Sequence, residues 1–281
     1  MIWKCRDRIL DCGARVQIMG VLNVTPDSFS DGGRYFHVEA AVARGLEMVA
    51  EGADIIDIGG ESTRPGAEPV DLDVELGRVI PVVQALREST RCLLSVDTSK
   101  AAVARAAIEA GARAINDVTA LRGDPQMAAA AADSGAGVVL MHMRGSPATM
   151  QREPRYSDVT EEVRAFLCER LAAATAAGID PDCVVLDPGI GFGKTVDHNL
   201  ELLRRLEVLA GIGRPVLIGV SRKSFLGRIL GSERLEDRDW PTVGLTAYSA
   251  EKGASIVRVH DVRPNVEAAR MMKAILTAGE P

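Results

Sequence analysis

Several features that mark other classes of protein are missing from this sequence. Its five cysteines, at positions 5, 12, 92, 168 and 183, contain no C-x-x-C pair, so neither a zinc site nor a thioredoxin-like redox pair is indicated. No uncharged apolar run approaches about 18 residues, and no membrane span is expected. The segment Met1–Leu10 carries four charged residues and no apolar stretch, so we expect no signal peptide and a cytoplasmic location with reduced thiols.

The sequence also lacks an excess of positive charge. The sequence has 33 Lys and Arg against 39 Asp and Glu, and the net charge of −6 argues against a nucleic-acid-binding protein, which usually carries a basic face. An anionic substrate is still compatible with this balance, because cations can gather locally in an acidic protein. The four histidines show no H-E-x-x-H or paired spacing, so a structural or catalytic zinc is rejected.

What the sequence does contain is eight short apolar runs rich in Val, Ile and Leu. The runs do not alternate with polar residues, which is typical of strands that are buried on both faces of a parallel sheet. They cover Val16–Leu22, Asp54–Ile58, Cys92–Val96, Ala114–Ile115 with its flanks, Gly137–Met141, Cys183–Leu186, Pro215–Val220 and Ser255–Val259.

Segments with helical spacing separate these runs, and eight βα units of this length predict an α/β protein with a (β/α)8 TIM-barrel fold. We expect a single domain over residues 1–281, with residues 1–15 as an N-terminal extension. An open doubly wound sheet is the alternative, but the count of eight favours closure. The predicted helices are Ala40–Glu51, Asp73–Glu88, Ala101–Ala110, Pro125–Ser134, Glu161–Ala177, Asn199–Ala210, Thr242–Gly253 and Pro264–Ala278.

Three of the predicted loops are longer than a compact βα connection needs. Asn23–His37, Gly59–Leu72 and Met143–Asp158 follow strands 1, 2 and 5. All three leave the carboxyl ends of strands, which is the face where barrel active sites lie. We therefore expect them to act as lids.

Each apolar run is followed by a polar or ionisable residue. In chain order these are Asn23, Asp57, Asp97, Asn116-Asp117, His142, Asp187, Ser221-Arg222-Lys223 and the pair Arg258 and His260. Any one of them could cap a following helix, but eight at one rim predict a polar site built from many strand ends.

A structural role is nevertheless favoured for some residues at this rim. We interpret Asp57, Glu61 and Asp117 as helix caps or loop ties, and His142 as a satisfied core histidine. Lys194 is compatible with a solvated loop cation.

The residue types at the rim indicate a class of ligand. Asp97, Asn116, Asp187 and Lys223 suit a flat heterocycle with amide and amidine edges, because carboxylates accept its N–H groups and a lysine donates to its carbonyl. Arg258 and His260 suit a phosphate, and Asn23 suits a hydrated Mg²⁺ bound to that phosphate.

A glycine-rich segment follows the sixth run. Asp187–Thr195 ends like a P-loop, but Pro188 stands where the first Walker glycine belongs, and the spacing also misses G-x-G-x-x-G. ATP or NAD binding by this route is therefore not expected. The segment predicts a tight loop in which Phe192 can stack on a ring.

Seven motifs, in order, resemble the dihydropteroate synthase family of pterin-binding barrels, which act in folate biosynthesis. The first two are Gly20–Gly33 (GVLNVTPDSFSDGG) and Asp57–Gly66 (DIGGESTRPG). The others are Asp97-Thr98, Asn116-Asp117, Asp187–Lys194, Ser221-Arg222-Lys223 and Arg258–Val262, and the resemblance spans Val16 to Val262.

The resemblance implies a transferase that condenses 6-hydroxymethyl-7,8-dihydropterin diphosphate with p-aminobenzoate to give 7,8-dihydropteroate and diphosphate. By position it implies a pterin site of Asp97, Asn116, Met141, Asp187, Phe192 and Lys223. It implies a diphosphate site of Asn23, Arg258 and His260, where Asn23 also holds Mg²⁺ with help from Asp31. The implied p-aminobenzoate site comprises Phe29, Thr63, Arg64, Pro65, Phe192, Lys223 and Ser224, and the implied catalytic residues are Asp97, Lys223 and Asp31.

The implied mechanism agrees with the chemistry of these residues. Loss of diphosphate leaves a pterin cation that the Asp97 carboxylate can stabilise, and the neutral amine then attacks without a strong base. The loops after strands 1 and 2 would exclude water. A corrinoid-linked methyltransferase module and a non-catalytic paralogue are the alternatives.

The resemblance also implies partners. These are the two substrates and sulfonamides, which mimic p-aminobenzoate, and a second copy of the chain in a homodimer. The segment Trp240-Pro241 departs from the common family pattern. It indicates a role in helix packing or at a subunit interface, with Pro241 in a first helical turn.

Overall fold

The computed structural model describes residues 1–25, 34–62, 66–145, 149–151 and 153–278, with the backbone alone at residues 34–37. Its centre is a sheet of eight parallel strands in the order β8-β7-β6-β5-β4-β3-β10-β9. The strands are β3 (Gln17–Asn23), β4 (Ile55–Gly59), β5 (Leu93–Asp97), β6 (Ala114–Asp117), β7 (Gly137–Met141), β8 (Val184–Asp187), β9 (Leu217–Gly219) and β10 (Ile256–Val259). A parallel bridge between Leu186 and Val216 joins the two ends of this sheet, so the predicted barrel is confirmed over the open alternative.

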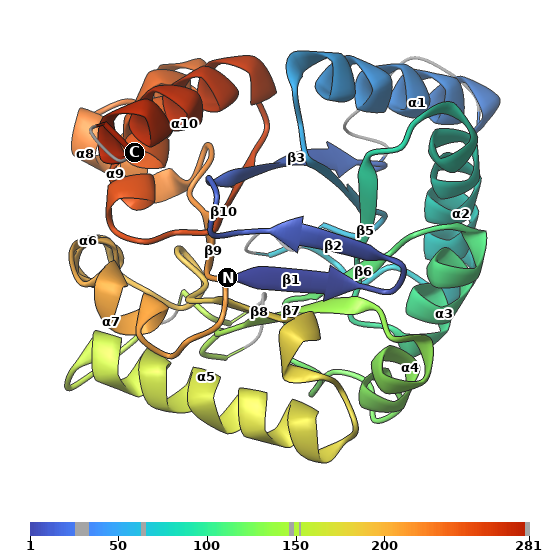
Figure 1. Ribbon diagram of the computed structural model, residues 1–281, viewed down its shortest axis with the longest axis horizontal. Coiled ribbons are helices and arrows are strands. Elements are labelled where there is room, and N and C mark those ends of the chain that lie inside the picture. The colour runs from blue at the N-terminus through green and yellow to red at the C-terminus, as the bar shows by residue number, and fades with distance from the viewer. Residues whose placement is uncertain (26–33, 63–65, 146–148, 152, 279–281) are drawn as a thin grey trace.

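Helices surround the barrel (Figure 1). They are α1 (Arg34–Glu51), α2 (Leu72–Ser89), α3 (Ala101–Ala110), α4 (Met127–Ser134), α5 (Val159–Ala176), α6 (Val196–Arg204), α7 (Leu206–Ala210), α8 (Ser224–Leu230), α9 (Asp239–Glu251) and α10 (Val262–Leu276), with 3₁₀ turns at Pro181–Cys183 and Glu236–Arg238. None of the helices in the described ranges combines the length and the apolarity needed to cross a membrane.

Some helix boundaries differ from the sequence-based expectation. The predicted helix Asn199–Ala210 is two helices, because Arg205 leaves the helical conformation between them (φ −106°, ψ 29°). The short helix α8 was not predicted, and α1 starts at Arg34 rather than Ala40. Pro241 lies in the first turn of α9, as predicted.

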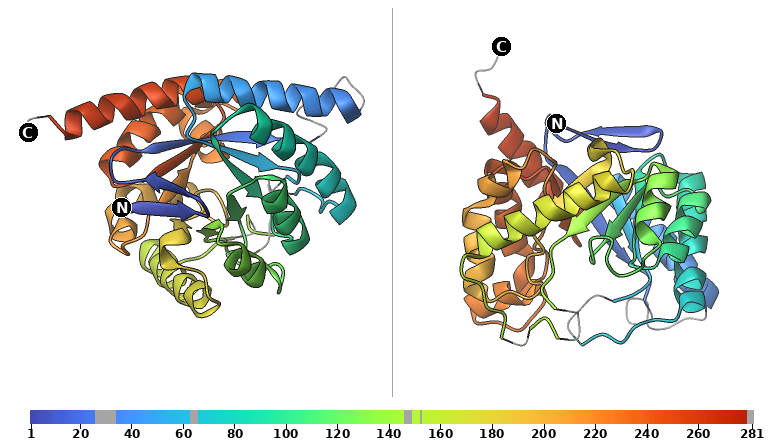
Figure 2. Two further views of the ribbon diagram at one scale, coloured as in Figure 1. Left: turned by 45° about the vertical axis from the view of Figure 1, so that its right-hand side comes forward. Right: turned by 90° about the horizontal axis from the view of Figure 1, so that it is seen from below.

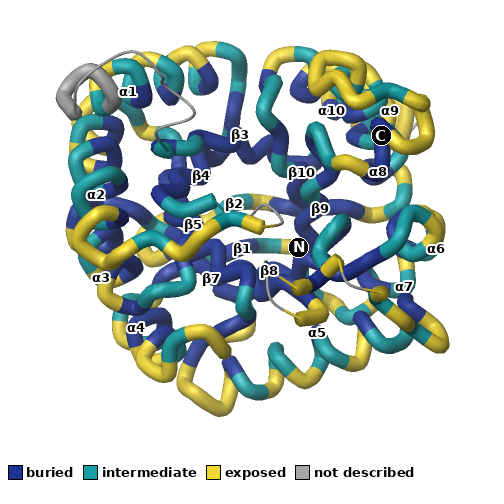
Figure 3. The backbone as a smooth tube through the Cα atoms, turned by 180° about the vertical axis from the view of Figure 1, so that it is seen from behind, coloured by how far each residue is buried: buried dark blue, intermediate teal, exposed yellow. Residues whose placement is uncertain are grey.

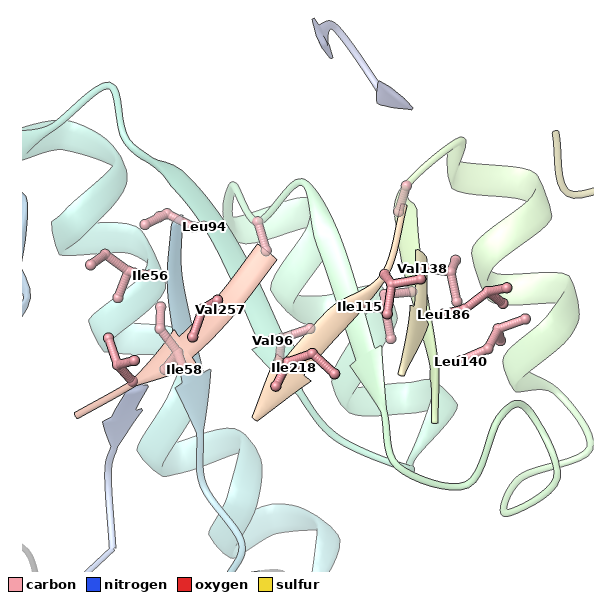
Figure 4. Close-up of a cluster of buried hydrophobic side chains, with 14 of the residues drawn as sticks. Ile56, Ile58, Leu94, Val96, Ile115, Val138, Leu140, Leu186, Ile218 and Val257 are labelled. Atoms are coloured by element: carbon pink, nitrogen blue, oxygen red, sulfur yellow. The ribbon is translucent and has the colours of Figure 1, made fainter. Parts of the chain in front are cut away.

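The outward-facing side chains of the strands form one continuous apolar layer beneath the helices. Ile56 and Ile58 of β4 and Leu94 and Val96 of β5 belong to this layer (Figure 4). Burial of this layer is the main favourable contribution to the fold. Figure 3 shows the result: the strands of the barrel are almost entirely buried, and exposed residues lie mainly on the surrounding helices and their connections.

The inward-facing side chains change character along the barrel axis. Near the amino ends they are apolar: Met19, Ile55, Leu93, Ala114, Val139, Val185, Leu217 and Ile256. Two residues further along four of the strands, the inward positions carry Asp57, Asn116, Asp187 and Arg258, and four residues further along β5 the inward position carries Asp97, because strand side chains alternate with a period of two. The expectation that the strands do not alternate is therefore wrong for their carboxyl-terminal halves.

A hairpin of β1 (Ile2–Cys5) and β2 (Arg8–Asp11) covers the amino-terminal end of the barrel (Figures 1 and 2). Trp3 and Cys5 are fully buried among the apolar inward-facing residues, and Trp3 Nε1 donates a hydrogen bond to Cys183 O at 2.8 Å. The glycine at position 137 makes room for them, since a Cβ there would lie 2.5 Å from Cys5 Sγ and 2.8 Å from the Trp3 ring. The hairpin and the polar strand ends thus occupy opposite ends of the barrel.

Candidate active site at the carboxyl-terminal mouth of the barrel

Arg258 is the centre of the polar network inside the barrel mouth. Its Nε donates to Asp57 Oδ2 at 2.6 Å, and a terminal guanidinium nitrogen donates to Asp97 Oδ2 at 2.8 Å. Asn116 Nδ2 donates to the same oxygen of Asp57 at 2.8 Å. Four residues from four strands are therefore brought together, and Asp57 is the acceptor that orients two of them.

Burial changes the ionisation of the Asp97 carboxyl. The residue is only 7% exposed, and removal from water raises the pKa of its carboxyl to about 7, although Arg258 acts in the opposite direction. The carboxyl groups of Asp57, Glu75 and Asp117 raise the Asp97 pKa further. Asp97 is thus an ionisable group whose charge changes near neutral pH and depends on the presence of Arg258.

Asn23 lies beside Asp97 at the rim. A Cβ placed on Gly59 would be 3.5 Å from Asp97 Cβ and 3.8 Å from Asn23 Oδ1, so the two side chains flank this glycine on neighbouring strands. An amide oxygen and a carboxylate at one rim are oxygen ligands of the kind that Mg²⁺ prefers. Within the described part of the chain, no group of three or more His, Cys, Asp and Glu could hold a metal. A magnesium ion at this rim would take its remaining oxygen ligands from water and from a bound phosphate.

A second group of residues occupies the other side of the mouth. Lys223 donates to Ile190 O, and its Nζ lies 4.6 Å from the centroid of the Phe192 ring. Asp187 Oδ1 accepts from Gly189 N at 2.6 Å. Burial lowers the pKa of Lys223 to about 8 and raises that of Asp187, while each acts on the other in the opposite direction.

An apolar wall adjoins this second group. Phe192 packs against a cluster formed by Val118, Met141, Met143 and Met150. In the pairing of β7 with β8, Met141 is opposite Asp187. Polar edges next to an apolar wall are typical of a pocket for a flat heterocycle.

The remaining strand-end residues lie close by. His260 Nδ1 is 2.9 Å from Ser221 Oγ, and Ser221 also accepts from the His260 backbone N–H. Arg222, between Ser221 and Lys223, has a φ of 58°, and Asp239 holds its guanidinium through two hydrogen bonds of 2.7 and 3.2 Å. Ser224 is the first residue of α8 and is exposed.

Lys194 is not the solvated cation that the sequence suggested. It is 3% exposed, and its Nζ lies 2.9 Å from Gly189 O, 3.0 Å from Phe192 O and 3.0 Å from His142 Nδ1. Burial lowers the pKa of Lys194 well below its usual value and that of His142 to about 2. Position 189 requires glycine, since its φ is 66° and a Cβ would lie 1.9 Å from His142 O.

The other structural interpretations can now be compared with the contacts. His142 is a buried, partnered histidine as expected, and Asp117 ties its own loop by accepting from Thr119 N, Thr119 Oγ1 and Leu121 N. Glu61 forms an ion pair with Lys100 and also serves as a loop tie. Asp57 is different: the interpretation as a cap or loop tie is wrong, because its side chain faces the barrel interior and holds Arg258 and Asn116.

The structure therefore brings Asn23, Asp97, Asn116, Met141, Asp187, Phe192, Lys223, Arg258 and His260 to one end of the barrel. Phe29, Asp31, Thr63, Arg64 and Pro65 lie outside the described residues. Sequence reasoning undervalued Asp57, although its position two residues after the inward-facing Ile55 was a usable signal. It also missed Glu75 and Lys100, for which the sequence pattern gave none.

Comparison with known proteins identifies the ligand class. A family model described as pterin binding enzyme matches residues 19–260. Dihydropteroate synthase of Mycobacterium leprae (strain TN) is 51% identical over 272 residues, which are 95% of this chain and 95% of that protein.

Solved structures agree with this match. Xanthomonas albilineans dihydropteroate synthase with 4-aminobenzoic acid has a TM-score of 0.92 at 49% identity, and covers 99% of this chain and 98% of that one. Yersinia pestis dihydropteroate synthase in complex with a sulfonamide drug has a TM-score of 0.93 at 45% identity, covering 99% and 100%.

A closed barrel with this polar mouth, matched over most of its length by that family model, defines a pterin-binding enzyme. Within that class, the chain belongs to the dihydropteroate synthase family. It is a transferase of folate biosynthesis that condenses 6-hydroxymethyl-7,8-dihydropterin diphosphate with p-aminobenzoate to form 7,8-dihydropteroate and diphosphate. The sequence-based prediction of the activity is confirmed, and the corrinoid methyltransferase alternative is set aside.

Proposed function

We propose that the pterin ring binds between the two polar groups at the barrel mouth. Asp97, Asn116 and Asp187 accept from and donate to its amino-pyrimidinone edge, and Lys223 donates to a ring acceptor. Met141 and Phe192 supply the apolar face. The observation that carries this proposal is the convergence of Asp97, Asn116 and Arg258 on and around Asp57.

The diphosphate group occupies the rim next to the pterin. Arg258 and His260 contact its oxygens, and Arg258 can exchange part of its pairing with Asp97 for the incoming anion. Asn23, assisted by Asp31, would hold a magnesium ion at this site. When bound, magnesium would neutralise the negative charge that develops on the leaving diphosphate. The support for this assignment is the position of Asn23 Oδ1 beside Asp97.

The reaction is dissociative. The C–O bond between the pterin methylene and the diphosphate breaks, and the electron pair leaves with the diphosphate. The resulting cation is delocalised into the ring, and the ionised Asp97 carboxylate stabilises it. The amine nitrogen of p-aminobenzoate then forms the new C–N bond with its lone pair and afterwards releases a proton to solvent.

The amine site lies at the outer edge of this pocket. Phe29, Thr63, Arg64, Pro65 and Ser224 bind p-aminobenzoate together with Phe192 and Lys223. Because sulfonamides mimic p-aminobenzoate, this site also makes the enzyme sensitive to them, a proposal supported by the sulfonamide complex of the Yersinia pestis relative.

The protein acts as a homodimer in the cytoplasm. Large exposed apolar side chains occur on helices α8, α9 and α10 and on the segment between α8 and α9: Ile229, Leu230, Leu235, Trp240, Met271, Ile275 and Leu276. Exposed apolar surface of this kind is typical of a subunit interface. The cytoplasmic location is supported by five cysteines that form no disulfide.

The experiment measures diphosphate release and dihydropteroate formation in parallel, with Mg²⁺ and the dihydropterin diphosphate, with and without p-aminobenzoate. Amine-dependent dihydropteroate formation supports the proposal. Diphosphate release without dihydropteroate contradicts the assigned amine site, and pterin binding without turnover favours a non-catalytic paralogue.

A further inference from the structure

An ionic cluster that is buried at Glu75 and half-buried at Lys100 and Glu61 lies behind Asp97, outside the barrel interior. Glu75 of α2 is fully buried, and its two carboxylate oxygens accept from different partners. Thr98 Oγ1 donates to Oε1 at 2.6 Å, and Lys100 Nζ donates to Oε2 at 2.6 Å. Thr98 is the residue after Asp97, so Glu75 fixes the chain at the end of β5.

The same cluster holds the start of the second long loop. Lys100 Nζ also pairs with Glu61, two residues after the end of β4. Close packing reinforces this contact, since a Cβ on Gly60 would lie 2.8 Å from Val79 and 3.0 Å from Glu75 Cγ. Arg78 adds a hydrogen bond of 2.8 Å to Gly60 O. The end of β4, the end of β5 and α2 are therefore locked to one another.

Stability alone does not explain such a cluster. Removing charges from water costs about as much free energy as their pairing returns, and apolar side chains of similar volume often stabilise a fold as well or better. What an ionic cluster with fixed hydrogen bonds provides is a defined geometry. Here that geometry relates the base of the loop to Asp97.

We propose that Glu61 and Lys100 are positioning residues that set the second loop, and hence the p-aminobenzoate site, relative to Asp97. The inference rests on the proposed assignment of Thr63, Arg64 and Pro65 to that site, which follows Glu61 by two residues in the chain. Without the Glu61–Lys100 pair, the amine is misplaced relative to the pterin methylene, while the pterin site inside the barrel is unchanged.

The test variant is Glu61→Gln, which removes one charge and leaves the Lys100–Glu75 pair in place. The control is Glu68→Gln, which makes the same charge change at an exposed position of the same loop. Loss of a charged hydrogen bond predicts a rise of about tenfold in the KM for p-aminobenzoate in Glu61→Gln. The affinity for the dihydropterin diphosphate and the melting temperature stay as in Glu68→Gln.

A second variant tests the cluster from the other side. Lys100→Met raises the same KM and in addition lowers the melting temperature, because the buried Glu75 carboxylate loses its cation. Lys100→Arg, which retains the charge, restores most of the KM. This rescue would not occur if position 100 only filled space.

Two results overturn the inference. One is an equal KM for p-aminobenzoate in Glu61→Gln and Glu68→Gln. The other is a loss of affinity for the dihydropterin diphosphate in Glu61→Gln that is as large as its rise in the KM for p-aminobenzoate. Arg64→Ala separates this failure from failure of the proposed amine site. If Arg64→Ala raises the KM and Glu61→Gln does not, the positioning role alone is wrong; if Arg64→Ala also leaves it unchanged, the proposed amine site fails and the inference with it.

Discussion

Truncation of Trp3 to alanine tests the role of the N-terminal hairpin as the floor of the barrel. The indole is fully buried against the apolar inward-facing residues and donates to Cys183 O at 2.8 Å. The variant removes this ring and leaves the Cys183 carbonyl without its donor. Because the polar site is at the opposite end of the barrel, the change is expected to affect stability and not chemistry.

The magnitude follows from burial. Replacing a fully buried tryptophan by alanine costs about 4 kcal/mol through lost transfer free energy and the cavity left behind. For a chain of this size that loss lowers the melting temperature by about 7 °C. Trp3→Phe keeps most of the apolar area and loses the hydrogen bond, so it should cost about 1–2 kcal/mol.

The assay is urea unfolding of the wild type, Trp3→Ala and Trp3→Phe, monitored by circular dichroism. The kcat of each protein is measured at 25 °C in parallel. Ile9→Ala is the matched control, because Ile9 lies on the same hairpin and is 65% exposed. For Trp3→Ala we expect a lower urea midpoint at an unchanged slope of the free energy of unfolding against urea concentration. For Ile9→Ala the free energy of unfolding should stay within about 0.5 kcal/mol of wild type. The kcat should be unchanged in every variant. Equal midpoints for Trp3→Ala and Ile9→Ala would refute the floor role, and a large loss of kcat in Trp3→Ala would refute the separation of the two ends.

The other predictions concern the polar mouth. Asp97→Asn should abolish turnover and leave the circular dichroism spectrum of the fold in place; turnover at the wild-type rate would contradict the cation-stabilising role. Burial raises the pKa of Asp97 in the folded protein to about 7, above its value of about 4 in the unfolded chain. The neutral carboxyl therefore contributes stability that is fully present below about pH 4 and is lost as the pH rises through 7. The melting temperature of Asp97→Asn relative to wild type should therefore increase between pH 4 and 8. The kcat/KM for the pterin substrate should fall below about pH 7, where Asp97 is protonated, and above about pH 8, where Lys223 loses its proton. Lys194→Met should weaken pterin binding in calorimetry, since the loop carrying Phe192 loses three hydrogen-bonded contacts. Removal of Mg²⁺ by chelation should slow diphosphate release with little effect on binding of a pterin that lacks the diphosphate.

The barrel could be predicted because its signals are local. Each strand is a short apolar run, each helix has its own periodicity, and parallel strands connected by helices place all carboxyl ends at one face. For this reason the sequence alone identifies the residues at the strand ends, such as Asp97, Asn116 and Arg258, as candidates for the site. The motifs that resemble one family then gave the activity.

The direction of individual side chains was less predictable. Asp57 and Asp117 both follow apolar residues and were given the same structural interpretation, yet Asp57 holds Arg258 inside the barrel and Asp117 ties its own loop. The two-residue periodicity of strands distinguishes the inward-facing Asp57 from the outward-facing Asp117. It does so only when the strand boundaries are known to within one residue. Lys194 is in the loop after β8, where no periodicity indicates burial, and contacts with His142, Gly189 and Phe192 bury it instead of leaving it solvated.

By itself, the sequence determined the eight βα units, the face that carries the site and the chemical types that stand there, since all of these depend on neighbours a few residues apart. Only the tertiary structure decided that Arg258 bridges Asp57 and Asp97, that Trp3 closes the far end of the barrel, and that Glu75 and Lys100 connect two loops. These contacts join residues as many as 201 positions apart, and no local pattern specifies which distant partners meet until the sheet closes.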